Sequence, residues 1–192
     1  MQENILPFDG EIYYYPNFFD DQSSRKYFAE LKNEIPWQQK SIKIFGKSVN
    51  EPRLTAFYGD ESKVYTYSGL KLTPLSWTSN LASIKEKIET KIQHKFNVVL
   101  LNYYRDGKDG MGWHRDNERE LGSEPIIASV SFGASRNFCL RNFFDKKIKK
   151  SLILESGSLL VMKGKSQQYW EHSIPKITKC DERINLTFRF IM

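Results

Sequence analysis

Cysteine is scarce in this sequence. The 192 residues include two, Cys139 and Cys180, and neither lies in a spacing typical of a metal site or a redox motif. Two cysteines cannot build the disulfide framework that stabilises many small secreted domains. We therefore interpret both as ordinary reduced residues. The chain is long enough to bury a sizeable hydrophobic core instead.

Long apolar runs are also absent. No stretch approaches the roughly 20 apolar residues of a membrane-spanning helix, and the first residues, MQENILPFDG, lack the basic and then apolar layout of a signal peptide. We therefore expect an intracellular protein without membrane association, cytoplasmic if bacterial and nuclear if eukaryotic. No repeat, low-complexity block or linker divides the chain, and 40% hydrophobic with 27% charged residues indicates a single globular domain over residues 1–192.

Acidic residues are fewer than basic residues in this sequence. The chain has 29 lysines and arginines against 23 acidic residues, a net charge of +6 and an isoelectric point near 9.2. A basic balance favours polyanionic partners such as nucleic acids. Solvated surface lysines would give the same numbers, so the charge alone does not identify a partner.

The periodicity of apolar residues changes along the chain. Residues 20–35, ended by Pro36, and residues 79–96 have the three-to-four spacing of amphipathic helices. Short, alternating, strand-like segments make up most of the rest. They cover residues 38–60, 63–72, 97–104, 126–133, 136–142, 151–155, 157–164 and 183–192. This order predicts an α+β domain in which helices back a β-sandwich or barrel.

Histidine is as rare as cysteine. Of the three histidines, His114 lies two residues before Asp116 in GMGWHRDNE. Residues i and i+2 of an extended chain project to the same side, and a histidine with a carboxylate forms two thirds of the facial triad that binds non-haem Fe(II). His172, before a proline-marked turn, is the candidate third ligand, whereas His94 is interpreted as a helix surface residue. By itself, a His-x-Asp match is more often structural than functional.

The last strand-like segment, RINLTFRF, has two distinct faces. Alternation places Arg183, Asn185, Thr187 and Arg189 on one side and four apolar residues on the other. Two inward guanidiniums would require an anion, and a dicarboxylate would bind both. Asn102 and Tyr104 would add neutral donors from a neighbouring strand. The alternative is that this polar face is exposed to solvent.

Several motifs together resemble one family. LNYYRDGKDGMGWHRDNERELGSEPIIASVSFGASRNFCLR, GSLLVMKG, WEHSIP and RINLTFRF are similar to the AlkB family of Fe(II)- and 2-oxoglutarate-dependent dioxygenases, and IFGK, PRLTAFYGD and YTYSGLKLTPLSW resemble its duplex-DNA repair type. The resemblance runs from about residue 37 to the end. It implies a double-stranded β-helix, or jelly roll, with the N-terminal helices outside. Nucleotide-recognition hairpins would lie within about 37–70, and the iron and 2-oxoglutarate core within about 97–192.

The resemblance also implies roles for individual residues. His114, Asp116 and His172 would be the catalytic iron ligands. The 2-oxoglutarate contacts would be Asn102, Tyr104, Arg183, Asn185, Thr187 and Arg189. The substrate contacts would be Phe45, Gly46, Lys47, Arg53, Tyr65, Thr66, Tyr67, Ser68, Asn117 and Glu118.

Two substrate positions depart from the family pattern, because Tyr67 replaces the common phenylalanine and Asn117 replaces an aspartate. Phe45 would fill the gap that a flipped base leaves in the stack, and Tyr67 would stack on that base. Lysines such as those of DKKIKK, residues 145–150, would follow phosphates, unless that run is only a solvated hairpin tip.

The activity implied is oxidative demethylation of 1-methyladenine and 3-methylcytosine in DNA. Fe(II) would be the metal cofactor, O2 and 2-oxoglutarate would be consumed, and formaldehyde, succinate and CO2 would be released. The protein would act as a monomer, and its partner would be duplex DNA and also single-stranded DNA. The alternatives are an RNA demethylase and a nucleic-acid-binding module without turnover.

Overall fold

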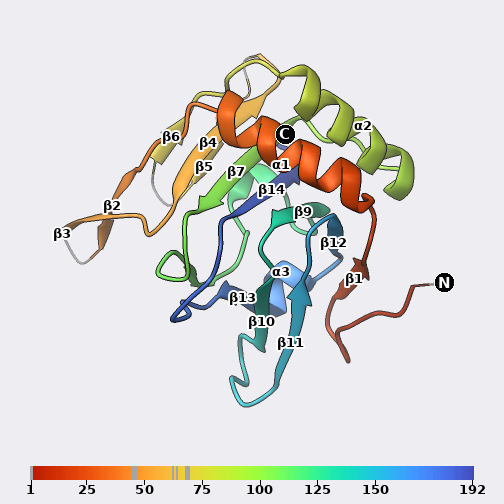
Figure 1. Ribbon diagram of the computed structural model, residues 1–192. Coiled ribbons are helices and arrows are strands. Elements are labelled where there is room, and N and C mark those ends of the chain that lie inside the picture. The colour runs from red at the N-terminus through yellow and green to blue at the C-terminus, as the bar shows by residue number, and fades with distance from the viewer. Residues whose placement is uncertain (1, 45–46, 62, 64, 68–69) are drawn as a thin grey trace.

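Two antiparallel sheets form the centre of the protein. The computed structural model describes residues 2–44, 47–61, 63, 65–67 and 70–192 (Figure 1). The larger sheet has six strands, in the order β1 (Glu11–Tyr15), β12 (Ser158–Lys163), β9 (Ile127–Gly133), β14 (Arg183–Arg189), β7 (Val98–Tyr104) and β4 (Leu54–Gly59). The smaller sheet has four strands, in the order β11 (Lys149–Leu154), β10 (Arg136–Asn142), β13 (Trp170–Ile174) and β8 (Met111–His114).

The two sheets share one apolar cluster. Ile127 and Leu160 of the larger sheet pack in the same buried group as Phe138, Leu140 and Trp170 of the smaller sheet. The cluster identifies the two sheets as the walls of a jelly roll. The predicted α+β fold with a jelly-roll core is therefore confirmed.

Two helices cover the outer face of the larger sheet (Figure 1). Helix α1 (Asp21–Glu34) begins at Asp20, whose side chain accepts a hydrogen bond from the backbone N–H of Ser23, and it ends before Pro36, as predicted. Helix α2 (Ser79–Ile92) begins at a Thr78 cap. It ends four residues before the predicted end at residue 96, because Gln93 adopts a left-handed conformation with φ of 54°.

Strand β14 lies between β9 and β7 and has both faces buried. Its Ile184, Leu186 and Phe188 belong to the core beneath the two helices. Because side chains alternate, Arg183 and Arg189 point to the opposite face, towards the smaller sheet. A solvent-exposed polar face is thereby excluded, since both arginines are at most 3% exposed.

Two short hairpins lie beyond β4. They are formed by β2 (Ser41–Ile44) with β3 (Lys47–Asn50), and by β5 (Tyr65–Tyr67) with β6 (Leu70–Leu72). The backbone positions of Lys47, Tyr65, Thr66 and Tyr67 therefore lie on these strands. Phe45, Gly46 and Ser68, which the sequence proposes as substrate contacts, lie outside the described residues.

Three strands of the sheets were not predicted, namely β1, β8 and β13. EIYYY and GMGWH do not alternate clearly between apolar and polar residues, and β13 pairs with β8 through a register shift. The short elements η1 (Arg119–Leu121) and α3 (Ser166–Tyr169) complete the described structure. Among the described helices, none has the length and apolarity needed to cross a membrane.

Candidate active site

His114, Asp116 and His172 converge between the two sheets. His114 ends β8, and the strand register places it directly opposite His172 on β13, with ring centroids 4.1 Å apart. Asp116 follows β8 and is 1% exposed. The candidate ligand atoms of the three residues all lie within 4.8 Å of one another. The sequence motif and the distant histidine therefore meet at one point.

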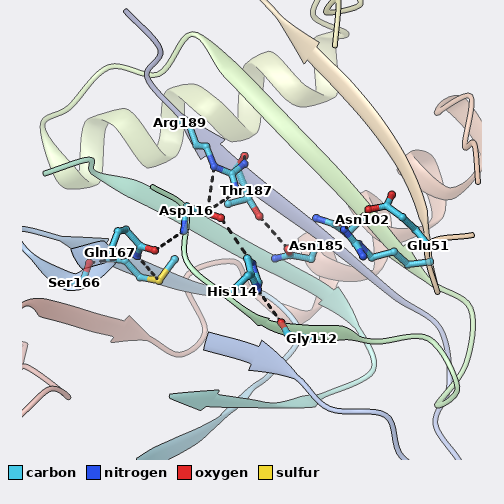
Figure 2. Close-up of polar contacts among 12 residues, drawn as sticks. Glu51, Asn102, Gly112, His114, Asp116, Ser166, Gln167, Asn185, Thr187 and Arg189 are labelled. Carbon is cyan, nitrogen blue, oxygen red and sulfur yellow. Dashed lines mark hydrogen bonds and ion pairs between the residues drawn. The ribbon is translucent and has the colours of Figure 1, made fainter. Parts of the chain in front are cut away.

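Hydrogen bonds orient the loop that carries these groups (Figure 2). Nδ1 of His114 lies 2.9 Å from the carbonyl oxygen of Gly112, which fixes a proton on Nδ1 and leaves Nε2 free of that proton. This Nε2 faces Asp116, 3.7 Å from its Oδ1. The backbone N–H of Asp116 donates to Oε1 of Gln167 at 2.9 Å. His114 is thus oriented by its own segment, and Asp116 is held by a residue of α3 (Ser166–Tyr169).

Asp116 uses its two carboxylate oxygens differently. Oδ2 accepts hydrogen bonds from Arg189, at 2.5 Å from Nη2 and 3.2 Å from Nε. Oδ1 is buried and has no hydrogen-bond partner among the described residues. Burial alone would raise the pKa of Asp116, but the charge of Arg189 and then those of the histidines lower it to about 2. Asp116 is therefore an ionised carboxylate with one oxygen available.

Both histidines favour the neutral form. Burial is the main cause that lowers the pKa of His172, to about 3, and the neighbouring His114 lowers it further. Burial also lowers the pKa of His114, although Asp116 partly opposes this effect. Neutral imidazoles and an ionised carboxylate are the states that bind a metal. The donor set fits Fe(II), for which two histidines and one carboxylate form a facial triad with open positions.

Arg183 provides the second unusual feature of the site. Its guanidinium lies over the ring of Tyr104, 4.9 Å from the centroid, and its Nη2 donates to Oγ of Ser131 at 2.9 Å. The residue is 1% exposed, and its Nε and Nη1 have no hydrogen-bond partner among the described residues. A buried cation with two unused donors is costly unless an anion binds it. This arrangement fits a carboxylate of 2-oxoglutarate.

The other polar residues of β14 are already paired within the protein. Nδ2 of Asn185 donates to Ser129 and to the carbonyl oxygen of Val130, and its Oδ1 accepts from Thr187 at 3.1 Å. Arg189 binds Asp116. Arg183 therefore requires an external anion. Arg189 does not, because Asp116 already neutralises it, so the expectation that one dicarboxylate would neutralise both arginines is not met.

A cavity of about 50 Å³ connects the cluster of His114, Asp116 and His172 with Arg183. Its lining includes the three candidate iron ligands and the six residues that the sequence assigned to 2-oxoglutarate. Arg53 lines it as well, and apolar side chains such as Leu154, Met162 and Ile174 close it. The residues proposed to bind the metal and those proposed to bind the co-substrate therefore line the same cavity.

The remaining predicted residues are more dispersed. Asn117 is exposed and Glu118 half-buried, both directly after Asp116. His94 is half-buried beside the end of α2, 5.2 Å from the ring of Phe96, away from the cavity.

Sequence patterns missed several residues that shape the site. Ser129 and Ser131 occupy alternate positions of β9 opposite β14, a signal that strand alternation could have revealed. Phe138 stacks on His172 at 5.3 Å. Gln167 binds Asp116 from 51 residues away, and Glu51 binds Arg53, which lies two residues along the chain. No local pattern marks either residue.

Comparisons with known proteins agree with this geometry. Residues 11–189 match the family model of the 2OG-Fe(II) oxygenase superfamily. The chain is 38% identical over 189 residues to mouse "Alpha-ketoglutarate-dependent dioxygenase alkB homolog 3", covering 92% of this chain and 65% of that protein. It is 39% identical over 189 residues to human "DNA oxidative demethylase ALKBH2", covering 93% of this chain and 72% of that protein.

A solved structure supports the fold. The chain resembles the structure titled "The structure of OsALKBH1" with a TM-score of 0.66 and 18% identity, over 93% of this chain and 97% of that one. At this identity the likeness concerns the fold alone. The chain spans about 65% of the length of the mouse relative.

Proposed function

Because this chain belongs to the 2OG-Fe(II) oxygenase superfamily, and within it to the AlkB family, we propose that it removes methyl groups from nucleobases of DNA by oxidation. The observation that carries the proposal is that His114, Asp116 and His172 line the same cavity as Arg183, two of whose donors have no partner among the described residues. Fe(II) with 2-oxoglutarate and O2, when bound, supplies the oxidising chemistry.

Six residues of the cavity have a defined task in this proposal. Nε2 of His114, a ring nitrogen of His172 and Oδ1 of Asp116 would hold the iron. Arg189 keeps Asp116 ionised and fixes its orientation through Oδ2. Arg183 binds a carboxylate of 2-oxoglutarate with Tyr104 packed beneath it. The apolar wall of the cavity limits the entry of water.

The substrate class follows from the relatives and from the charge of the chain. The human relative is named a DNA oxidative demethylase, and this chain carries a net charge of +6, which favours a polyanion. We propose N1-methyladenine and N3-methylcytosine as the substrates, with release of formaldehyde. Acting on DNA, the protein would work in the bacterial cytoplasm or the eukaryotic nucleus.

The direct test is turnover of a methylated oligonucleotide. We expect the purified protein with Fe(II), O2 and 2-oxoglutarate to release formaldehyde and succinate in equal amounts from N1-methyladenine DNA. His114→Ala should reduce this turnover at least about 100-fold, because it removes a metal ligand. Single-stranded DNA, duplex DNA and RNA of one sequence should be compared at one salt concentration. Iron binding without turnover on any of the three would refute the proposal.

We further propose that a monomer binds duplex DNA and flips the base into the cavity. Hairpin β2–β3, which carries Phe45 at its turn in the sequence, would fill the vacated stack. Base contacts would come from Tyr65, Thr66 and Tyr67 on the second hairpin, and from Asn117 and Glu118 beside the iron ligands.

The turn between β10 and β11 is the proposed phosphate contact. Lys146, Lys147 and Lys149 are exposed there, and among the described residues none of the three forms an ion pair. Phe143, at the base of this turn, stacks under the guanidinium of Arg115, 3.7 Å from the ring centroid. Arg115 lies between two proposed iron ligands in the sequence, so this contact joins the base of the basic turn to the segment that carries His114 and Asp116.

Replacing these three lysines by alanine should weaken binding to duplex DNA and leave 2-oxoglutarate affinity unchanged. The slope of log affinity against log salt should fall by up to about 3, roughly one for each lost phosphate contact. Fluorescence anisotropy at several salt concentrations measures both quantities. A matched control changes Lys26, Lys87 and Lys91, three exposed lysines of α1 and α2. Equal slopes for the two triple variants would contradict a specific role for the turn.

A further inference from the structure

A buried ion pair lies at one side of the cavity, where Arg53 is part of the lining. Arg53 and Glu51 are 2% and 4% exposed, and Nη2 of Arg53 lies 3.1 Å from Oε1 of Glu51. Nε of the same guanidinium donates to Oδ1 of Asn102 at 2.6 Å. Figure 2 shows Glu51 on the far side of Asn102 from the iron-ligand cluster. The pair therefore reaches the cavity through Arg53 itself and also holds the side-chain amide of Asn102.

The contact with Arg53 decides which way the amide of Asn102 points. An arginine side chain has donors and no acceptor, so the atom 2.6 Å from Nε must be the amide oxygen. With the oxygen bound to Arg53, the amino group is what Asn102 can present to a ligand. Asn102 lines the cavity and lies directly opposite Asn185 across the β7–β14 ladder. An amino group attracts a carboxylate, whereas the oxygen in its place would repel it.

Glu51 is itself fixed in place by the backbone. Its N–H donates to the carbonyl oxygen of Lys40 at 2.8 Å, and its carbonyl oxygen accepts from Nε2 of Gln39 at 3.0 Å. These two bonds hold the backbone of Glu51 at the position from which its carboxylate binds Arg53. An anchored carboxylate gives the buried guanidinium a partner and limits its rotation.

We propose that Glu51 and Arg53 are positioning residues, which hold the amide of Asn102 with its amino group towards a carboxylate of 2-oxoglutarate. The inference rests on the proposed function, because it concerns the same co-substrate. It assigns Glu51 a positioning role, which the sequence patterns did not predict for any residue. It also changes the expected role of Arg53 from a base contact to a support for the co-substrate.

Asn102→Asp tests the orientation directly. Aspartate keeps an oxygen for Arg53 and has nearly the same shape, but it replaces the amino group by a second oxygen. We expect the dissociation constant for 2-oxoglutarate, measured by calorimetry without O2 and with Mn(II) in place of iron, to rise about 10- to 100-fold, as for the loss of one hydrogen bond to a charged group. An unchanged dissociation constant would overturn the proposal.

Glu51→Met separates positioning from simple charge. Removing the carboxylate makes the surroundings of the cavity more positive, so a charge effect alone would tighten 2-oxoglutarate binding. Loss of positioning would weaken it, and weaker binding is the result that we expect. Tighter binding would show that Glu51 acts only through its charge and would overturn its assignment.

Arg53 variants distinguish the co-substrate from the nucleic acid. Arg53→Met should weaken 2-oxoglutarate binding, and Arg53→Lys should restore part of it, because lysine can still donate to the amide oxygen. A matched control is Arg141→Met, which breaks another arginine–glutamate pair, 2.7 Å long and outside the cavity lining, and should leave this affinity unchanged. If Arg53→Met weakened binding of DNA alone, Arg53 would contact the base and the inference would be wrong.

The two proposals fail in different ways. If the unchanged protein with Mn(II) does not bind 2-oxoglutarate, the proposed function is wrong. If the unchanged protein binds it and Asn102→Asp binds it equally well, only the positioning role is wrong. Should Arg53→Met fold poorly, Asn102→Asp still decides the question, because it preserves the contact with Arg53.

Discussion

Asp116→Ala is expected to remove metal binding and to destabilise the fold in one step. The substitution deletes Oδ1, the proposed iron ligand, and also Oδ2, which accepts two hydrogen bonds from Arg189. Arg189 is 3% exposed, and a buried charge that loses its partner typically costs about 3–5 kcal/mol. Urea unfolding of the metal-free protein measures the loss of stability, and calorimetry with Mn(II) measures the loss of metal affinity.

Two further variants separate these effects. Asp116→Asn keeps an oxygen for Arg189, so we expect a smaller loss of stability together with a large loss of metal affinity. Adding Arg189→Met to Asp116→Ala removes the guanidinium that has lost its carboxylate and should recover part of the stability without recovering metal binding. An Asp116→Ala protein that unfolds at the same urea concentration as the parent would show that the ion pair with Arg189 does not stabilise the fold.

Arg183→Met should abolish 2-oxoglutarate binding and yet leave the ligand-free protein about as stable as before. Two buried donor nitrogens of Arg183 have no hydrogen-bond partner within the described part of the chain, and burial lowers the pKa of its guanidinium. Replacing it by an apolar side chain of similar length removes that unfavourable burial, which offsets the lost contacts with Ser131 and Tyr104. We expect 2-oxoglutarate affinity to fall by about 100-fold or more, because a charged, two-donor interaction disappears.

Thermal unfolding with and without the co-substrate checks this second prediction. At concentrations well above its dissociation constant, 2-oxoglutarate should raise the unfolding temperature of the parent protein. It should not raise that of Arg183→Met. Arg183→Lys is the conservative control, which keeps the charge and loses the two-donor geometry, so its response should lie between the two. An undiminished rise in Arg183→Met would mean that 2-oxoglutarate binds elsewhere.

Sequence periodicity predicted those features whose signals lie within a few residues of one another in the chain. The helix of residues 20–35 could be predicted because its spacing, its Asp20 cap and Pro36 are all local. The two faces of β14 could be predicted because alternation follows from the geometry of any strand. His114 and Asp116 formed a candidate metal pair for the same reason. His172 was the candidate third ligand because it precedes a proline-marked turn, and the family resemblance then identified the dicarboxylate as 2-oxoglutarate.

Long-range pairing could not be predicted in this way. Arg189 and Asp116 are 73 residues apart, and only the packing of β14 against the segment after β8 makes them an ion pair. The contact of Arg53 with Asn102 spans 49 residues and depends on β4 lying beside β7.

The amino-acid sequence by itself determined which residues could form helices and strands, which faces would be apolar, and which side chains could bind a metal or an anion. Those properties depend on backbone geometry and on the chemistry of each side chain. Only the tertiary structure decided that Arg183 keeps its donors for a ligand while Arg189 gives its donors to Asp116. The two arginines share one strand face, and the difference arises from what each meets across the cavity.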